Sequence, residues 1–340
     1  MATLSASSYN LLDVTRTIGP DGQQMAIAEI LSQDNETLDE MTWKEGNLIT
    51  GNRHTERASL PTVGWRRLNE GVARSKSTNR SVDEAAAMLE ANSQVDRELA
   101  ILSQNPAKFR LDEASAFMES MKQEFNQTLF YGNSTLAPEE YTGFAPRFGS
   151  LSGPNADQII DCGGTGTDNR SIWLIGWDTN KVTGIYPKGT VGGLMHMDTT
   201  SNVRIGPDGF PIGDELEDAS GRPYLGYKDH WSWKCGLAVQ DARYVVRLCN
   251  LDKSLMEGAA ASGPALEDFL VQAVERIHGR TARMAFYAPR IATTFLRRRL
   301  LDDKQAFLSL EEVGGRKVTH FDGIPFRRVD QLEVDEARIT

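Results

Sequence analysis

The stretch from Leu111 to Tyr131 constrains this fold most, because its apolar residues recur at the spacing of a single long helix. The apolar stripe consists of Ala114, Phe117, Met118, Met121, Phe125 and Leu129. The polar face carries Glu119, Lys122, Gln123 and Asn126. Asp112 and Glu113 suit the positive end of a helix dipole, and Gly132 suits a left-handed position after the last turn. We therefore predict an amphipathic helix over residues 111–131, about 30 Å long, that packs through one face.

The segment of residues 41–80 has too few apolar side chains to form a core of its own. Its chain is interrupted at Gly46, Gly51, Pro61, Gly64 and Gly71. From residue 53 to residue 80 its basic residues are Arg53, Arg57, Arg66, Arg67, Arg74, Lys76 and Arg80, against only Glu56 and Glu70. We expect two extended strands joined by a loop, and such a ribbon is marginal in isolation. The segment is therefore either a flexible surface loop or an arm that lies on a neighbouring subunit.

The remaining elements predict a mixed α+β fold. Helices are expected over Gln24–Leu31, Ser81–Leu102, from Pro264 to Gly279, and from Pro289 to about Leu301. Strands are expected over Gln158–Cys162, Ser171–Trp177, Val182–Tyr186, most of Tyr227–Cys249, Met284–Ala288, Val318–Phe321 and Arg327–Leu332. The repeated Ile-Gly-Pro-Asp-Gly sequence predicts turns at Ile18–Gly22 and Ile205–Gly209. This order of elements favours α+β.

Composition excludes several classes of protein. The 340 residues carry a net charge of −10, which disfavours non-specific nucleic-acid binding by the chain as a whole. The N-terminus lacks a signal-peptide pattern, and no apolar run reaches the roughly 18 residues that span a bilayer. We therefore expect synthesis in the cytoplasm and no membrane partner. Cys162, Cys235 and Cys249 are odd in number and widely spaced, which predicts buried free thiols rather than disulfides or a zinc site.

Motifs for chemistry are weak. Gly163–Gly166 lacks the spacing of a phosphate-binding loop, so we expect a tight hairpin there. His196 and Asp198 have no HExxH partner, and GxSxG is absent. The most acidic run, which contains Asp214, Glu215, Glu217 and Asp218, lacks the alternating ligands of a calcium loop and predicts a solvated acidic loop. We expect no catalytic, cofactor-binding or metal-binding residues and no enzyme activity.

Three segments carry a resemblance to a known family: Trp233–Asp252, Met284–Leu296 and Phe321–Asp330. Together with the order of elements, they resemble the major capsid proteins of tailed bacteriophages with the Hong Kong 97-type fold, in particular the short-tailed phage group. The parts that this resemblance implies are an N-terminal arm at residues 1–40, an extended loop at 41–80, a peripheral domain at 81–149 with its spine helix at 111–131, and a mainly axial domain at 150–340. Strands at about 227–249 and at the C-terminal end would return to the peripheral domain.

The implied function is self-assembly through pentamers and hexamers into an icosahedral shell that encloses double-stranded DNA without specific binding. The implied partners are other copies of the chain, a portal protein, decoration or cement proteins and a separate scaffold, because no long acidic helical segment stands before residue 40. The location would be the virion, after assembly in the cytoplasm of the bacterial host. An encapsulin-like compartment and an α/β enzyme with an unrecognised site are the alternatives. The expected contact residues are Trp65, Arg66, Arg67 and Arg74, which would meet acidic surfaces such as Asp214, Glu215, Glu217 and Asp218.

Overall fold

The computed structural model describes residue 33 and residues 35–103, 105–202, 204–217, 220–257, 265–279, 283–302, 308–313 and 316–340. The chain divides into two compact units. Of the described residues, unit 1 contains Gln33, Met88–Phe125 and Gly193–Trp233, and unit 2 contains those of 35–87, Asn126–Gly192 and Lys234–Thr340. The turn predicted at Ile18–Gly22 and the helix predicted at Gln24–Leu31 lie outside the described residues.

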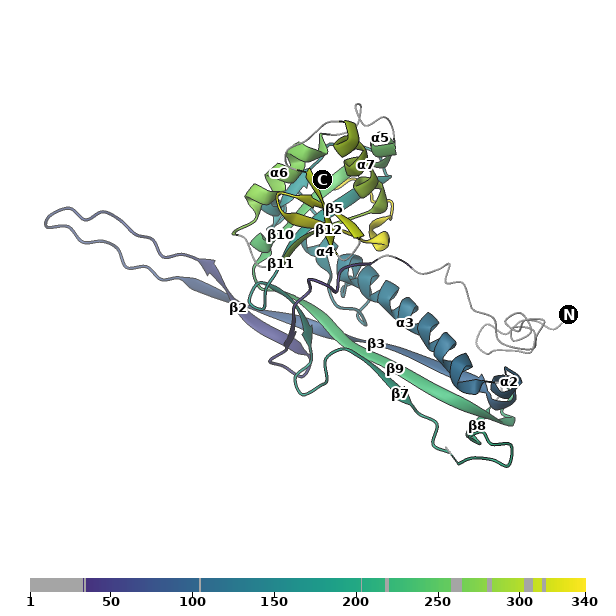
Figure 1. Cartoon of the computed structure of the whole chain (residues 1–340). Coiled ribbons are helices and arrows are strands. Elements are labelled where there is room, and N and C mark those ends of the chain that lie inside the picture. Colours follow the sequence, from purple (N-terminus) through teal and green to yellow (C-terminus); the bar gives the residue numbers. More distant parts are fainter. Residues whose placement is uncertain are drawn as a thin grey trace. The chain divides into compact units, whose positions relative to one another are not determined.

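Helices and strands are both abundant, as expected for an α+β protein (Figure 1). The helices are α2 (Arg97–Leu102), α3 (Pro106–Tyr131), α4 (Phe144–Arg147), α5 (Lys253–Glu257), α6 (Leu266–Arg276) and α7 (Arg290–Asp302), with short 3-10 helices at Ala156–Gln158, Ala242–Tyr244 and Asp330–Leu332. The first strands are β1 (Trp43–Glu45), β2 (Gly51–Ser59), β3 (Thr78–Asp96), β4 (Ile159–Asp161), β5 (Asn169–Trp177), β6 (Val182–Tyr186) and β7 (Leu194–Asp198). The later strands are β8 (Asp214–Glu217), β9 (Pro223–Val239), β10 (Val245–Asp252), β11 (Arg283–Ala288), β12 (Leu308–Val313), β13 (Arg316–Phe321) and β14 (Ile324–Arg328).

In unit 1, aromatic side chains of α3 pack on β9, which pairs antiparallel with β7 and β8. Phe117 stacks on Trp231 with ring centroids 4.7 Å apart, and Phe125 stacks on Trp233 at 4.5 Å. Such stacked pairs bury a large apolar area in a defined geometry. The predicted apolar stripe is therefore confirmed at its aromatic positions, but it is narrower than predicted, because Met118 is 42 % exposed.

The ends of α3 differ from the sequence prediction. The helix begins earlier, at Pro106, because the Asn105 side chain accepts a hydrogen bond from the backbone N–H of Lys108 at 3.1 Å. Pro106 occupies the first turn, where no backbone N–H is needed. Gly132 does not adopt the predicted left-handed conformation. A Cβ there would lie 2.5 Å from the carbonyl oxygen of Thr128, so this position requires glycine for a close backbone approach.

The polar face of α3 binds a neighbouring stretch of chain. In unit 1, Glu119 accepts a hydrogen bond from the backbone N–H of Gln33 at 2.8 Å, and Lys122 donates to the Gln33 carbonyl at 3.0 Å. In unit 2, the hydroxyl of Thr37 donates to the buried side chain of Asn126. The polar residues of this face therefore bind Gln33 and Thr37.

The core of unit 2 is built on two almost completely buried strands, β5 and β10, which pair antiparallel. β4 joins β10 in parallel, and β11 joins β5 and then β14, with β13 and β12 beyond. The helices α6 and α7 lie beside these strands (Figure 1). Leu270 of α6 and Phe295 of α7 belong to one apolar cluster with Leu174 and Val246. Strands covered on both faces carry near-continuous apolar runs, as these do. The predictions of α6, α7 and β11 are confirmed.

The helix predicted over Ser81–Leu102 is wrong. The chain forms the long strand β3, and only Arg97–Leu102 is helical. β3 pairs antiparallel with β2 from Gly51 opposite Ala85 to Ser59 opposite Thr78, and it neighbours β9. The pairing of β3 with β9, and with β2 as far as Ala85, outweighs the helix propensity of Ala85–Leu89, which is a weak preference. Of the two extended strands expected within residues 41–80, β2 lies inside the segment, whereas its partner β3 begins only at Thr78 and lies almost wholly beyond it.

Candidate intersubunit contact surface

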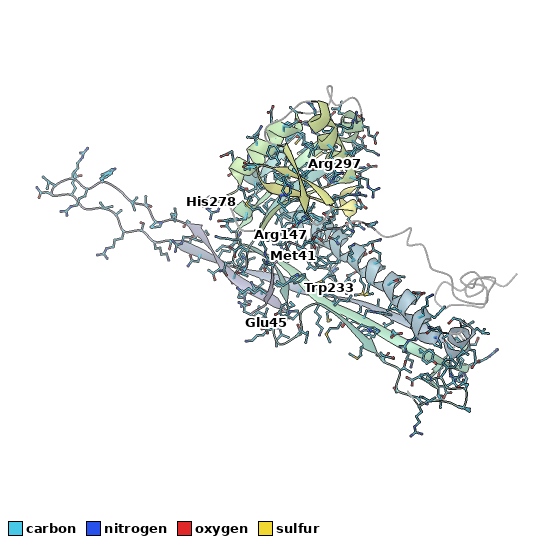
Figure 2. All side chains as sticks on the ribbon, viewed as in Figure 1. Met41, Glu45, Arg147, Trp233, His278 and Arg297 are labelled. Carbon is cyan, nitrogen blue, oxygen red and sulfur yellow. The ribbon has the colours of Figure 1, made fainter. Side chains whose placement is uncertain are left out.

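The outer part of the β2–β3 hairpin contributes nothing to the core of unit 2. Every residue from Arg57 to Lys76 is exposed, and we call these residues the hairpin arm. Trp65 is fully exposed, whereas the other tryptophans are buried or half-buried. Leu60, Val63 and Leu68 are also exposed. The side chains of the arm stand away from the packed residues of unit 2 (Figure 2). Clustered exposed apolar groups of this kind mark a binding surface.

The arm is basic and has an ordered tip. Its charged residues are Arg57, Arg66, Arg67, Arg74 and Lys76, against Glu70. At the tip, Arg66 donates to the Glu70 carbonyl at 2.9 Å, and the Glu70 N–H donates to the Arg67 carbonyl at 3.2 Å. Asn69 has a φ of +68°, a conformation that asparagine tolerates in turns. The predicted residues Trp65, Arg66 and Arg67 therefore lie together, and Arg74 lies on the returning side.

The root of the hairpin is held by ion pairs within unit 2. Arg147 donates to both carboxylate oxygens of the buried Glu84, at 2.6 Å each. On the exposed side, Arg53 pairs with Asp83, and its guanidinium lowers the pKa of the Asp83 carboxyl below the ordinary value. Sequence reasoning missed Arg147, because it is 63 residues from Glu84 and no local pattern links the two.

Close backbone packing also fixes the root of the hairpin. A Cβ on Gly51 would collide with the carbonyl oxygen of Glu84, and Gly51 has a φ of +150°. A Cβ on Gly46 would collide in turn with the carbonyl oxygen of Gly51. The glycines noted in the sequence therefore allow the backbones to approach at the start of the hairpin, where side chains would separate them.

The acidic run forms a strand, not the solvated loop predicted from sequence. Asp214, Glu215 and Glu217 lie on β8 in unit 1, and Asp218 lies outside the described residues. Asp214 accepts hydrogen bonds from the backbone N–H groups of Ser201 and Asn202 at 2.8–3.0 Å, and these bonds lower the pKa of its carboxyl. Pairing with β9 supplies the backbone partners that a loop would take from water.

The two groups of predicted contact residues belong to different units. Arg66, Arg67 and Arg74 are in unit 2, and Asp214, Glu215 and Glu217 are in unit 1. Glu215 and Glu217 are exposed, and none of the described residues forms an ion pair with either. The expected pairing between the basic arm and the acidic strand stays a prediction.

The residues that were considered as candidate catalytic or metal-binding motifs make structural contacts. His196 hydrogen-bonds Asp229 at 2.9 Å and stacks on Trp231, and Asp198 pairs with Arg110 at 2.8 Å. Within the described part of the chain, no group of three or more His, Cys, Asp or Glu side chains is arranged to hold a metal ion. No described helix is long and apolar enough to span a membrane.

The segment Gly163–Gly166 is not the tight hairpin that was predicted. It connects β4 and β5, which do not pair with each other but flank β10 on its two sides. The cysteines are free, and burial raises the pKa of Cys235 to about 12 and that of Cys249 to about 11. Thiols with such pKa values remain protonated at neutral pH and are poor nucleophiles.

Comparison with solved structures identifies the class of protein. The chain is 28 % identical to a chain in the structure of bacteriophage Epsilon15, with a TM-score of 0.76 and 100 % of each chain covered. The bacteriophage JBD30 capsid matches at 9 % identity and a TM-score of 0.48, over 91 % of this chain and 95 % of that one. The SrpI encapsulin complex of Synechococcus elongatus PCC 7942 matches at 12 % identity and a TM-score of 0.39, over 74 % and 93 %. The fold is that of phage capsid proteins, the Hong Kong 97-type fold.

The model of the family described as major capsid protein GP7 matches residues 19–340. The chain belongs to the major capsid protein GP7 family. Comparison with curated protein sequences finds no match. As a major capsid protein, the chain is a structural component of the virion that assembles into the capsid shell. The family match decides between the phage-capsid and encapsulin hypotheses in favour of the capsid.

Proposed function

We propose that this subunit assembles through pentamers and hexamers into an icosahedral shell around phage double-stranded DNA, and that the hairpin arm joins each subunit to its neighbour. The observation that carries the proposal is the continuous exposure of residues 57–76, with Trp65 at the tip. A tryptophan and three aliphatic side chains held in water gain stability only when a partner covers them. Burying one such side chain contributes about 1.5–3 kcal/mol, so the arm can supply a strong contact.

Many contacts of this kind would sum over a shell. A head-to-tail contact, in which the arm of one copy lies on the next, closes into a ring when the rotation allows it. Each subunit gives one arm and receives another, so modest individual contacts become a stable assembly. The arm would also contribute positive charge, through Arg66, Arg67 and Arg74, that is complementary to an acidic surface of the neighbour. Such complementarity favours one specific docking position over non-specific association.

We assign parts of the chain to this assembly as follows. Residues 1–40, of which 1–32 and 34 lie outside the described part of the chain, are assigned to an N-terminal arm. Residues 41–80 are assigned to the extended loop, 81–149 to a peripheral domain with its spine helix at 111–131, and 150–340 to a mainly axial domain. Strands at about 227–249 and at the C-terminal end return to the peripheral domain. The net charge of −10 supports a wall that encloses DNA without binding it specifically, because like charges repel.

The partners beyond other copies are a portal protein, a separate scaffold and decoration or cement proteins. Assembly takes place in the host cytoplasm, and the subunit has no enzyme activity. The membership of a structural protein family supports a purely structural role.

The double variant Arg66→Glu and Arg67→Glu tests the arm. It should keep the far-ultraviolet circular dichroism and thermal unfolding of the unchanged protein, because both side chains are exposed and outside the core. Shell formation, followed by sedimentation velocity and negative-stain microscopy, should fall at least about tenfold in yield. The matched control reverses two other exposed arginines, Arg204 and Arg338, and should assemble. Normal shells from the double variant would refute the role of the arm.

A further inference from the structure

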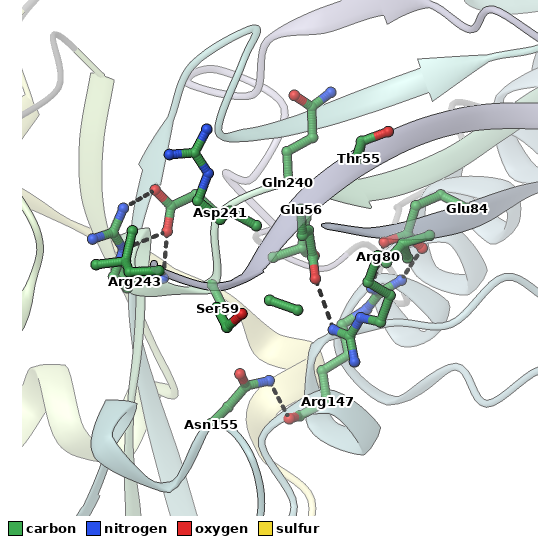
Figure 3. Close-up of a pocket in the computed structure, with 16 residues that line it drawn as sticks. Thr55, Glu56, Ser59, Arg80, Glu84, Arg147, Asn155, Gln240, Asp241 and Arg243 are labelled. Atoms are coloured by element: carbon green, nitrogen blue, oxygen red, sulfur yellow. Dashed lines mark hydrogen bonds and ion pairs between the residues drawn. The ribbon is translucent and has the colours of Figure 1, made fainter. Parts of the chain in front are cut away.

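A cavity of about 790 Å³ lies at the root of the hairpin, within unit 2 (Figure 3). One wall is formed by residues 55–60 of β2 and its continuation, together with Arg80, Val82 and Glu84 of β3. The opposite wall is the turn of residues 239–243 between β9 and β10, and Arg147 and Asn155 close the bottom. Its volume is in the range of pockets that hold several side chains.

The acidic and basic side chains of the cavity differ in their exposure to solvent. Of its carboxylates, Glu84 is buried at 6 % side-chain exposure, and Asp241 and Glu56 are half-buried at 15 % and 28 %. Two of its guanidinium groups face solvent, with exposures of 69 % for Arg80 and 56 % for Arg243. Each carboxylate is paired with an arginine, so the more exposed charges of the cavity are cationic.

One cationic group of the cavity has no partner in the described part of the chain. Arg57 lines the cavity and is exposed, and no ion pair joins it to any described residue. By contrast, Arg80 pairs with Glu56 at 2.7 Å and Arg243 pairs with Asp241 at 2.9 Å. These pairs hold the guanidinium groups in place, which lowers the entropy cost of binding an anion. A concave site with fixed guanidinium groups and an available arginine suits carboxylates.

Two exposed carboxylates on β8 have the charge that this cationic cavity would bind. On β8, Glu215 and Glu217 are exposed while Leu216 between them is buried, so the two carboxylates project from the same face of the strand. Alternate residues of a strand are about 7 Å apart, a spacing that lets two carboxylates meet two different arginines. Asp214 is less available, because its oxygens accept backbone hydrogen bonds from Ser201 and Asn202.

We propose that Glu215 and Glu217 of one copy dock into the cavity at the hairpin root of another copy, beside Arg57. This inference rests on the proposed function, because it names a contact within the assembled shell. It assigns the acidic strand to the root of the hairpin and leaves the tip, with Trp65, to a different surface of the neighbour. The cavity is concave and pre-organised, whereas the tip is convex and must itself enter a partner.

The first test reverses charge on each side separately. Arg57→Glu and the double variant Glu215→Lys, Glu217→Lys should both remain folded, and each should need at least about a tenfold higher protein concentration to assemble. Arg57→Gln removes the positive charge without adding a carboxylate. It should also raise the protein concentration needed for assembly, but by less than Arg57→Glu. Arg338→Glu is the matched control and should assemble normally. Normal assembly of Arg57→Glu would overturn the inference.

The second test combines the changes. A chain that carries Arg57→Glu together with the two lysine substitutions should regain assembly, because the contact is restored with reversed polarity. An equal mixture of the Arg57→Glu protein and the Glu215→Lys, Glu217→Lys protein should assemble more than either protein alone, because the altered cavity of one copy meets the altered strand of the other. A mixture that assembles no better than its components, while the combined chain assembles, would show a contact within one chain and overturn the inference.

Two further outcomes separate the alternatives. If the lysine substitutions are rescued by Arg66→Glu and Arg67→Glu, and not by Arg57→Glu, the acidic strand meets the tip; the inference then fails while the proposed role of the arm stands. If Arg57→Glu assembles normally but weakens binding of the unassembled protein to duplex DNA, the cavity is a nucleic-acid site and the inference also fails.

Discussion

Arg147 and Glu84 form a two-point ion pair at the root of the hairpin, with both N–O distances at 2.6 Å. Arg147 also donates to the carbonyl oxygens of Thr142 and Gly143, at 3.0 and 3.2 Å. All three nitrogens of the guanidinium group therefore donate hydrogen bonds, and the pair joins β3 to the end of α4. The Arg147–Glu84 pair is largely shielded from solvent, whereas the Arg53–Asp83 pair of the same hairpin is exposed.

Replacing Glu84 by alanine should destabilise the subunit strongly. The change leaves the guanidinium group of Arg147 buried without a carboxylate, which costs about 3–5 kcal/mol in comparable sites. The measurement is the free energy of unfolding from urea denaturation of the unassembled protein. The control is Asp83→Ala, which removes the neighbouring exposed partner of Arg53 and should cost much less. Equal losses for the two variants would contradict the assigned role of the pair.

Replacing Gly132 by alanine should also destabilise the subunit, although its φ is not positive. The added Cβ would lie 2.5 Å from the carbonyl oxygen of Thr128 and 2.7 Å from that of Tyr141. Such overpacking costs about 1–3 kcal/mol. Gly71→Ala is the matched control, because a Cβ there meets no atom within 4 Å, and it should change the stability by less than about 0.5 kcal/mol. The measurement is the midpoint of thermal unfolding of both variants. An unchanged midpoint for Gly132→Ala would contradict this close packing.

The stability of the subunit should fall in acid partly through Asp214. The backbone N–H groups of Ser201 and Asn202 lower the pKa of its carboxyl in the folded state. The folded protein therefore binds fewer protons here than the unfolded chain. The stabilisation is complete above the unfolded pKa of about 4 and is lost as the pH falls through the lower folded value.

The variant Asp214→Asn should be less stable than the unchanged protein at neutral pH and should show a smaller decline below about pH 4. Thermal unfolding between about pH 3 and 7 measures both effects. Glu217→Gln is the control on the same strand, because its exposed side chain has no ion-pair partner among the described residues. A pH profile of Asp214→Asn that matches the unchanged protein would contradict this assignment.

The elements that the sequence predicted well are those whose stability depends on their own residues. α3, α6 and α7 carry apolar residues at helical spacing over at least two turns, and each forms close to its predicted range. β5 carries the apolar run Ile172–Ile175, β10 is apolar except for Arg247, Asn250 and Asp252, and both strands are almost completely buried. The resemblance carried by Trp233–Asp252 and two later segments led to the correct family, because it depends on residue order rather than on any one element.

The elements that the sequence did not predict depend on distant partners. Ala85–Leu89 favour a helix locally, but they continue the strand β3, which pairs with β2 as far as Ala85 and neighbours β9. β8 is the exception, because the acidic run Asp214–Glu217 pairs with the nearby start of β9, from Asp214 opposite Gly226 to Glu217 opposite Pro223. The pair of Arg147 and Glu84 has no sequence pattern at all. For β3 and for this pair, the deciding interaction joins residues far apart along the chain.

The sequence by itself determined the periodic helices, the buried strands, the poverty of core residues in the segment 41–80 and the family of the protein. Only the tertiary structure decided that β3 is a strand, that Gly51 and Gly132 serve close backbone contacts, and that a cationic cavity forms at the hairpin root. The physical reason is that periodicity and burial are set by neighbouring residues, whereas ladder pairing, backbone approach and buried charge are set by whichever distant segment supplies the matching hydrogen bond or carboxylate.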